Sequence, residues 1–207
     1  QYVTPNKIIA SISYRIPYLN DHMASTFSLF LSGFSPYGNS FRYTNDMNGD
    51  GVNNDLIYIP KARGDIKFTS QDDENAFFAF IEQDKYLSKH KGEYAEAYAA
   101  RAPWVNRFDF RFVQDFSVKA GSTTNTLQLS LDLLNAGNLI NSKWGVYKNM
   151  NISNNGAILK YEGRDVNNTP SFSMTKVSGA YPTETYSSYL NISQCWMVQL
   201  GLRYIFN

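Results

Sequence analysis

The segment from Cys195 to Asn207 is the feature that most constrains the fold of this chain. Every second residue in it is apolar or aromatic, and the residues between them form a mixed, partly polar set. The apolar positions are Trp196, Val198, Leu200, Leu202, Tyr204 and Phe206. A period of two indicates a β-strand with one face in an apolar medium. The apolar stripe is roughly 33–37 Å long at about 3.3 Å per residue, which suits a tilted strand that crosses a bilayer.

The same segment carries a second pattern at its end. A polar residue, a glycine and two aromatic residues follow one another at the spacing of Gln199, Gly201, Tyr204 and Phe206. This order resembles the C-terminal assembly signal of bacterial outer-membrane β-barrels. The competing interpretation is the last strand of a soluble β-sandwich, which also alternates.

Composition narrows the class of protein. The formal net charge of +1 provides no basic footprint for nucleic acid. No apolar run approaches 18 residues, so no transmembrane helix is expected. The mean hydropathy of −0.38 is compatible with barrel strands, whose polar lumen face lowers the average. The chain has 15 Tyr and 14 Phe, as expected for interfacial aromatic girdles, and its single cysteine, Cys195, cannot form an internal disulfide.

The alternation predicts five antiparallel membrane strands that are sequential neighbours, at 5–16, 26–43, 104–118, 125–136 and 190–206. The side chains expected to face lipid are Phe108, Phe110, Phe112, Leu127, Leu129, Leu131, Trp196, Val198 and Leu200. The side chains expected to face the lumen are Arg107, Asp109, Arg111, Asp115, Gln128 and Asp132. A soluble sandwich would instead turn the phenylalanines inward, and the pattern alone does not separate the two.

The connections between these strands support the barrel interpretation. If the last strand ends in the periplasm, the long excursions 44–103 and 137–189 lie outside the cell, and the short turns 17–25 and 119–125 lie inside. Short periplasmic turns and long extracellular loops are the rule for outer-membrane barrels. Five strands cannot close a barrel, because about eight are needed. We therefore expect one domain over 1–207 that is the C-terminal part of a larger outer-membrane barrel. Export requires a signal peptide, and the sequence does not show one at its start. We therefore expect that an N-terminal portion of the protein lies before Gln1.

The first excursion opens with an acidic, glycine-containing stretch. Oxygen-bearing side chains at Asp46, Asn48 and Asp50, followed by Gly51, reproduce the first half of a calcium-binding loop. The closing Glu of an EF-hand is absent, and Asp55 could take its place. The alternative is an ordinary polar turn of Asn, Asp and Gly residues. The sequence favours a structural Ca²⁺ site slightly.

The excursions also contain local secondary structure. Ser70 is expected to cap a short helix whose apolar face includes Phe77, Phe80 and Ile81. A further helical turn is expected within 93–100, and a β-hairpin between 158–162 and 171–177. The two histidines lie in different segments, and no Ser/His/Asp or Cys/His set is apparent. We therefore expect no enzymatic activity.

Three stretches in family order resemble TonB-dependent receptors of the Bacteroidetes lineage, in the branch called Oar-like. The first is 45–60, which contains the acidic loop and ends in Leu56-Ile57-Tyr58-Ile59-Pro60. The second is 101–109, which begins with Arg101-Ala102-Pro103-Trp104. The third is 132–141, which is followed by Trp144-Gly145. Together with the C-terminal signal they span most of the chain.

This resemblance implies a barrel of about twenty-two strands in the bacterial outer membrane, an N-terminal plug outside this sequence, and a TonB box that takes energy from the inner membrane. The function it implies is import of a nutrient, with this segment as barrel wall and extracellular lid. The implied partners are outer-membrane lipid, the protein's own plug, TonB and the barrel assembly machinery. The alternative function is a non-transporting barrel that acts as an interaction partner or adhesin in a larger assembly, for example with a surface lipoprotein.

Overall fold

The structure of the chain, a computed structural model, describes residues 4–188 and 191–207. Strands predominate, and the chain divides into two compact units. One unit comprises 4–35, 104–147 and the described residues from 188 onward, and the other comprises 36–103 and 148–187. We refer to them as the sheet unit and the loop unit. Within the described residues, no helix is long and apolar enough to span a membrane.

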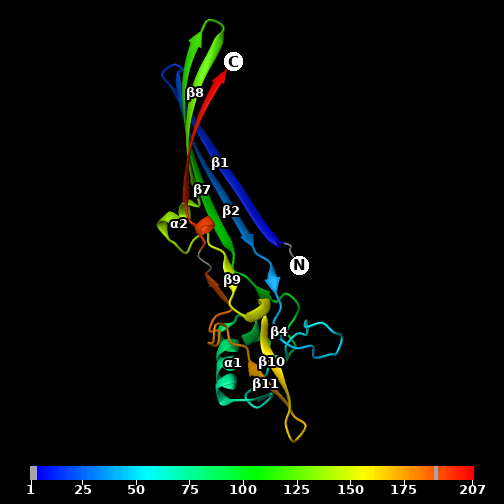
Figure 1. The fold of residues 1–207 in the computed structure, drawn as a ribbon. Helices are drawn as coiled ribbons and strands as arrows, with labels where there is room; N and C mark the ends of the chain where they lie inside the picture. Colours follow the sequence, from blue (N-terminus) through cyan, green and yellow to red (C-terminus); the bar gives the residue numbers. More distant parts are fainter. Residues whose placement is uncertain (1–3, 189–190) are drawn as a thin grey trace. The chain divides into compact units, whose positions relative to one another are not determined.

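The sheet unit is built on one five-stranded antiparallel sheet. Its strands are β1 (Asn6–Tyr18), β2 (Met23–Ser35), β7 (Val105–Ala120), β8 (Thr123–Leu134) and β13 (Met197–Phe206). They pair in the order β1-β2-β7-β8-β13, so each strand lies beside its predecessor in the series (Figure 1). The expectation of five antiparallel neighbours is confirmed.

The strand boundaries differ from those expected in three informative places. The second strand ends at Ser35 instead of 43, because Pro36 follows and proline cannot donate a ladder hydrogen bond. The first strand continues through Pro17 to Tyr18, and Pro17 lies opposite Ala24 next to the end of β1. The last strand begins at Met197 after a short 3₁₀ helix, Ile192–Gln194, and the expected start at 190 lies outside the described residues.

Tight hairpins join the strands at one end of the sheet. Leu19, Asn20 and Asp21 all adopt positive φ between β1 and β2, and Gly121 with φ +66° opens the turn between β7 and β8. The other ends of β2, β7, β8 and β13 lead into the long excursions. The short helix α2 (Ala136–Ile140) follows β8 directly and stays within the sheet unit.

The loop unit contains a four-stranded sheet, in the order β4-β10-β11-β5, and the helix α1 (Gln71–Gln83). The strands are β4 (Arg42–Tyr43), β5 (Lys67–Phe68), β10 (Ala157–Arg164) and β11 (Pro170–Met174). Two small sheets add β3 (Gly38–Asn39) with β6 (Ala100–Arg101), and β9 (Lys148–Met150) with β12 (Tyr186–Ser188). Short 3₁₀ helices lie at Leu87–Lys89 and Ser153–Asn155.

Local predictions for this unit are mostly confirmed. The side chain of Ser70 accepts a hydrogen bond from the backbone N–H of Asp73 and caps α1, and Phe77, Phe80 and Ile81 on this helix are fully buried. The hairpin of β10 and β11 forms as expected. The helical turn expected within 93–100 is wrong. The backbone around Tyr94 is extended there, because Ala95 N–H donates to Ile57 O and Ile59 N–H donates to Glu93 O.

The hydrophobic core lies in the loop unit. Its centre includes Phe41, Ile57, Phe80, Ile158 and Leu159, each at most 1% exposed. The core combines both long excursions, since the parallel pairing of β4 with β10 joins residues more than a hundred positions apart. The excursions therefore form a unit with its own interior, while the apolar side chains of the five-stranded sheet take no part in this cluster.

Candidate functional site

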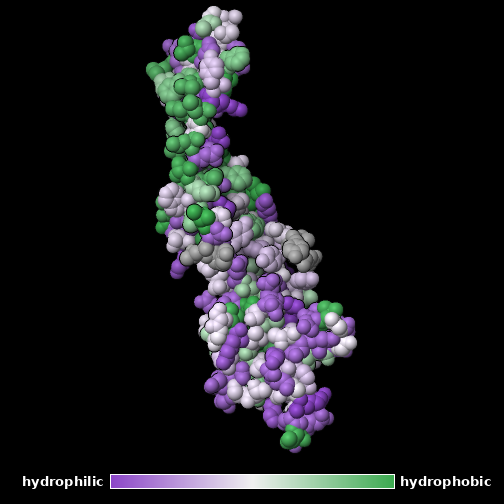
Figure 2. Space-filling model, viewed as in Figure 1, coloured by the Kyte–Doolittle hydropathy of each residue, from purple (hydrophilic) through white to green (hydrophobic). Residues whose placement is uncertain are grey.

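The five-stranded sheet has one apolar face that is exposed. The strand register places Tyr14, Phe27, Phe112, Leu131 and Leu200 in one row across all five strands. Leu200 is 75% exposed and Tyr14 is 69% exposed. Hydrophobic side chains gather on the visible surface of this sheet (Figure 2). All of the side chains expected to face lipid lie on this face or, in the case of Trp196, immediately before β13 and half-exposed.

The opposite face of the sheet carries polar side chains that pair across strands. Arg111 lies opposite Asp132, with Nε 3.4 Å from Oδ1. In the same row, the hydroxyls of Ser13 and Ser28 are 2.8 Å apart. Cross-strand pairs of opposite charge stabilise a sheet modestly. The structure thus brings the expected charges of β7 and β8 onto one face.

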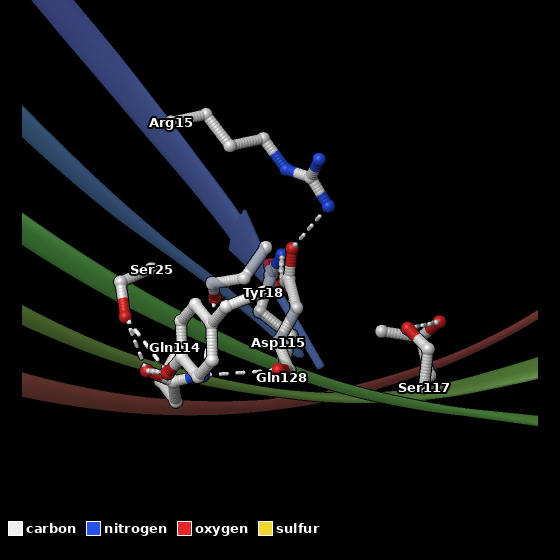
Figure 3. A network of polar contacts seen from close by, with 9 residues as sticks. Arg15, Tyr18, Ser25, Gln114, Asp115, Ser117 and Gln128 are labelled. Atoms are coloured by element: carbon white, nitrogen blue, oxygen red, sulfur yellow. Dashed lines mark hydrogen bonds and ion pairs between the residues drawn. The ribbon is translucent and has the colours of Figure 1, made fainter. Parts of the chain in front are cut away.

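Asp115 is the centre of a second polar group on this face. One carboxylate oxygen lies 3.6 Å from Nη2 of Arg15, and the other accepts a 2.8 Å hydrogen bond from Nε2 of Gln128 (Figure 3). The side chain of Asp115 is only 14% exposed, so these contacts compensate for the loss of water around a carboxylate. Arg15 was not among the expected functional residues.

The other two charged residues of β7 that were expected to face the lumen make different contacts. Asp109 accepts a 2.7 Å hydrogen bond from the backbone N–H of Asn135, and so holds the turn that ends β8. Arg107 has a buried Nε without a hydrogen-bond partner in the described part of the chain. The expected lumen-facing residues thus have four different roles. Arg111 and Asp132 form a charge pair, Asp115 and Gln128 belong to a polar cluster, Asp109 accepts from the backbone, and Arg107 keeps one buried nitrogen without a partner among the described residues.

Gln114 is a polar residue on the apolar face that the sequence pattern did not identify. Its Oε1 accepts hydrogen bonds from the hydroxyls of Ser25 at 2.6 Å and Tyr18 at 3.0 Å (Figure 3). Its Nε2 donates to the backbone oxygens of Ala24 and Asp115. The amide is fully paired without water, as a polar group in an apolar medium requires. The signal was present, because Gln114 interrupts the series of phenylalanines in β7.

The four residues of the assembly pattern divide between the two faces. Gln199 pairs with Asp132 on the polar side, and Gly201 lies opposite Ser130. A Cβ at Gly201 would be 2.5 Å from Ser130 Oγ, so the glycine allows these strands to pack without displacing that hydroxyl. Tyr204 and Phe206 lie on the apolar face with ring centroids 6.3 Å apart, and both are well exposed.

The acidic loop of the loop unit is held by its own side chains. Oδ1 and Oδ2 of Asp46 accept from the N–H groups of Gly49 at 2.6 Å and Gly51 at 2.7 Å. Asn48 and Asp50 each accept from the N–H two residues later, and Asp55 accepts from Met47 N–H. These hydrogen bonds, led by that from Gly51, lower the pKa of Asp46 and favour its charged form.

The geometry of this loop leaves calcium binding as a prediction. Carboxylate oxygens keep further lone pairs after accepting one N–H group, and three of the four expected ligands belong to one tight turn. In the ranges that the structure describes, however, no three His, Cys, Asp or Glu side chains are grouped to hold a metal ion. The residues fit a polar turn as they stand.

Comparison with models of protein families, with curated proteins and with solved structures found no match for this chain. Its function is therefore inferred from the geometry of the two units.

Proposed function

We propose that this chain forms part of the wall and the extracellular lid of a TonB-dependent transporter in the bacterial outer membrane, which imports a nutrient through a plugged barrel. The observation that carries the proposal is the contrast between the two faces of the five-stranded sheet. One face exposes mostly aliphatic and aromatic side chains on all five strands, and the other holds paired charges and amides. A sheet between lipid and an aqueous lumen requires this arrangement.

The exposed apolar face argues against a soluble sandwich. A soluble antiparallel sheet covers its apolar face with a second layer. Here the buried core cluster draws on the loop unit and includes none of the apolar face of the sheet. Large exposed apolar patches mark interaction surfaces with membranes or proteins, and a patch that runs across five long strands suits lipid.

The outer strands of the sheet support a larger barrel. Among the described strands, β1 and β13 each pair on one side only. Open edges do not occur in lipid, because each unpaired backbone group costs several kcal/mol there. We propose that further strands of the same protein cover both edges, and the resemblance to Oar-like receptors suggests about twenty-two strands in all.

A barrel of that width needs a plug, since large outer-membrane transporters have an occluded lumen. Arg107, Asp109, Arg111, Asp115 and Asp132 lie on the face that would turn toward it. Their mixed signs suit a hydrated contact with a plug domain. TonB, the barrel assembly machinery and outer-membrane lipid are the further partners of this proposal.

The deciding experiment is growth or uptake in cells that carry the complete gene, with and without its TonB box. Energised transport requires that deletion of the box abolish uptake of the nutrient that depends on the gene. Uptake that is unchanged by the deletion would reject transport. It would favour the alternative, a barrel that serves as an interaction partner or adhesin, which the independent core of the loop unit also suits.

A further inference from the structure

The loop unit contains an open cleft of about 1060 Å³. Its lining comes from three stretches of the unit, within 37–43, 47–56 and 94–98, and from the two single residues Asn155 and Phe172. Small-molecule sites are concave and of this order of size, at roughly 300–1,000 Å³. No residue of the five-stranded sheet takes part in the lining.

Three exposed tyrosines line this cleft. Tyr37, Tyr94 and Tyr98 are 50%, 70% and 46% exposed. The backbone directs Tyr94 outward, because the flanking strand-like pairing buries its neighbour Ala95. The ring of Tyr94 also packs against Tyr58, with centroids 5.4 Å apart and the planes at 61°, which limits its movement.

Tyr98 is held in a conformation that a bulky residue rarely adopts. Its φ is +62°, in the left-handed region. Its N–H donates to Ser40 Oγ at 2.8 Å, and its carbonyl oxygen lies 2.4 Å from the position that a Cβ of Gly38 would take. Backbone strain of this kind persists where the surrounding structure enforces it, and it is concentrated at functional sites.

The polar groups of the lining are almost all neutral. Among the described residues that line it, Arg42 and Asp55 are the only charged ones. The guanidinium of Arg42 donates to the backbone oxygens of Asn53 and Asn154, and Asp55 accepts from Met47 N–H. In the described part of the chain, the side-chain amides of Asn54 and Asn155 make no intramolecular hydrogen bond, and both residues are exposed.

We infer that this cleft is a binding site for a neutral oligosaccharide. A sugar ring presents weakly positive C–H groups on its faces, which suit the negative faces of tyrosine rings. Its hydroxyls around the rim suit free amides, which both donate and accept. Arg42 and Asp55 give the lining one positive and one negative charge, so it presents no net charge to attract a charged ligand. An extended peptide would lack an open edge at β4, because β10 pairs on one side and Leu56 bridges on the other.

This inference rests on the loop unit alone and does not depend on transport. The test uses the complete protein in detergent, probed with an array of neutral, sulphated and sialylated oligosaccharides of two to six sugars and an array of peptides. We expect neutral oligosaccharides to be retained, and titration calorimetry with the best of them to give a measurable Kd. Tyr94→Ser and Tyr98→Asn should each weaken this binding about 30-fold, which corresponds to about 2 kcal/mol. Asparagine is chosen at Tyr98 because it tolerates the left-handed conformation.

The matched control is Tyr147→Ser in the sheet unit. Tyr147 is also partly exposed and packs against a single ring, Phe34, with centroids 5.4 Å apart. It should leave the Kd unchanged, and all three variants should keep the thermal melting temperature of the unaltered protein to within a few degrees. Retention of only anionic glycans or only peptides, or binding of neutral sugars that both cleft variants leave intact, would overturn the inference.

Discussion

Nε of Arg111 lies 3.4 Å from Oδ1 of Asp132 across the pair of strands β7 and β8, at directly opposed positions of the register. The side chain of Arg111 is 53% exposed and that of Asp132 is 17% exposed. The adjacent positions Phe112 and Leu131, also opposed, point to the other face. Adjacent pairs of the register therefore differ completely in polarity: one is a charge pair on one face of the sheet, and the next is an apolar pair on the other face.

A charge introduced on the apolar face should destabilise the membrane-inserted protein. Leu200→Arg should lower the free energy of unfolding in lipid vesicles by about 2–4 kcal/mol, because Leu200 lies midway along β13 on the face proposed to contact lipid. The matched control is Gln199→Arg, whose side chain would lie on the other face, beside Asp132. It should change stability by less than about 1 kcal/mol, as an exposed ion pair does. Equal losses in urea titrations would contradict the proposed orientation.

The aromatic residues at the end of β13 should matter for assembly more than for stability. Phe206→Ser should reduce the amount of protein inserted in the outer membrane of cells, since Phe206 completes the pattern that resembles the assembly signal. Refolding of the purified variant into vesicles should proceed nearly as before, because Phe206 is the last residue of β13, and substitutions near the membrane interface cost little stability. Ile205→Ser, at the neighbouring position on the other face, is the control. A Phe206→Ser protein that reaches the membrane in normal amount would reject the signal.

Calcium should stabilise the acidic loop if Asp46, Asn48, Asp50 and Asp55 hold the ion. At a Ca²⁺ concentration about 100 times the Kd, binding to the folded state adds about 2.7 kcal/mol of stability. Limited proteolysis at 44–56 should slow on addition of Ca²⁺ and recover with a chelator, and Asp46→Ala should abolish the effect. Asp165→Asn is the control, because Asp165 also accepts backbone N–H groups within a turn. Cleavage rates that do not respond to Ca²⁺ would leave the polar turn as the explanation.

Asp73 should stabilise the loop unit in a pH-dependent way. Burial alone would raise the pKa of its carboxyl, but hydrogen bonds from Ser70, Met174 N–H, Tyr181 and Thr69 outweigh burial and lower it. A lowered pKa in the folded state contributes stability above the unfolded pKa of about 3.9, and this contribution is lost as pH falls through the folded pKa.

The variant Asp73→Asn should therefore lose about 1–3 kcal/mol at pH 7, and its difference from the unaltered protein should shrink below about pH 4. The adjacent Asp72→Asn is the control, since Asp72 is exposed and lies in the first turn of α1, where a negative charge favours the helix dipole. Thermal melts of both variants between pH 3 and pH 7 provide the measurement. A constant difference across this range would show that Asp73 acts by packing and not by its charge.

The local patterns of this sequence were sufficient for the elements that depend on nearby residues. Alternation in β7, β8 and β13 determined which side chains share a face, because side chains in a strand point to opposite faces in turn. Ser70 and the spacing of Phe77 and Phe80 were enough for α1, because helix capping and helical periodicity act within one or two turns. Short hairpin connections similarly determined that β1 pairs with β2 and that β7 pairs with β8.

Only the tertiary structure decided which distant groups meet. The strand that would have continued to 43 leaves the sheet at Pro36, and β4 pairs in parallel with β10, because both can bury apolar side chains in one core. Gln114 forms hydrogen bonds with Ser25 and Tyr18, and Asp73 forms one with Tyr181. The partners in each pair are about ninety residues or more apart in the sequence. The cleft of Tyr94 and Tyr98 likewise depends on pairing between separate stretches. Such contacts depend on the combined burial and hydrogen bonding of segments far apart in the chain, and the local sequence specifies the donors and acceptors but not their partners.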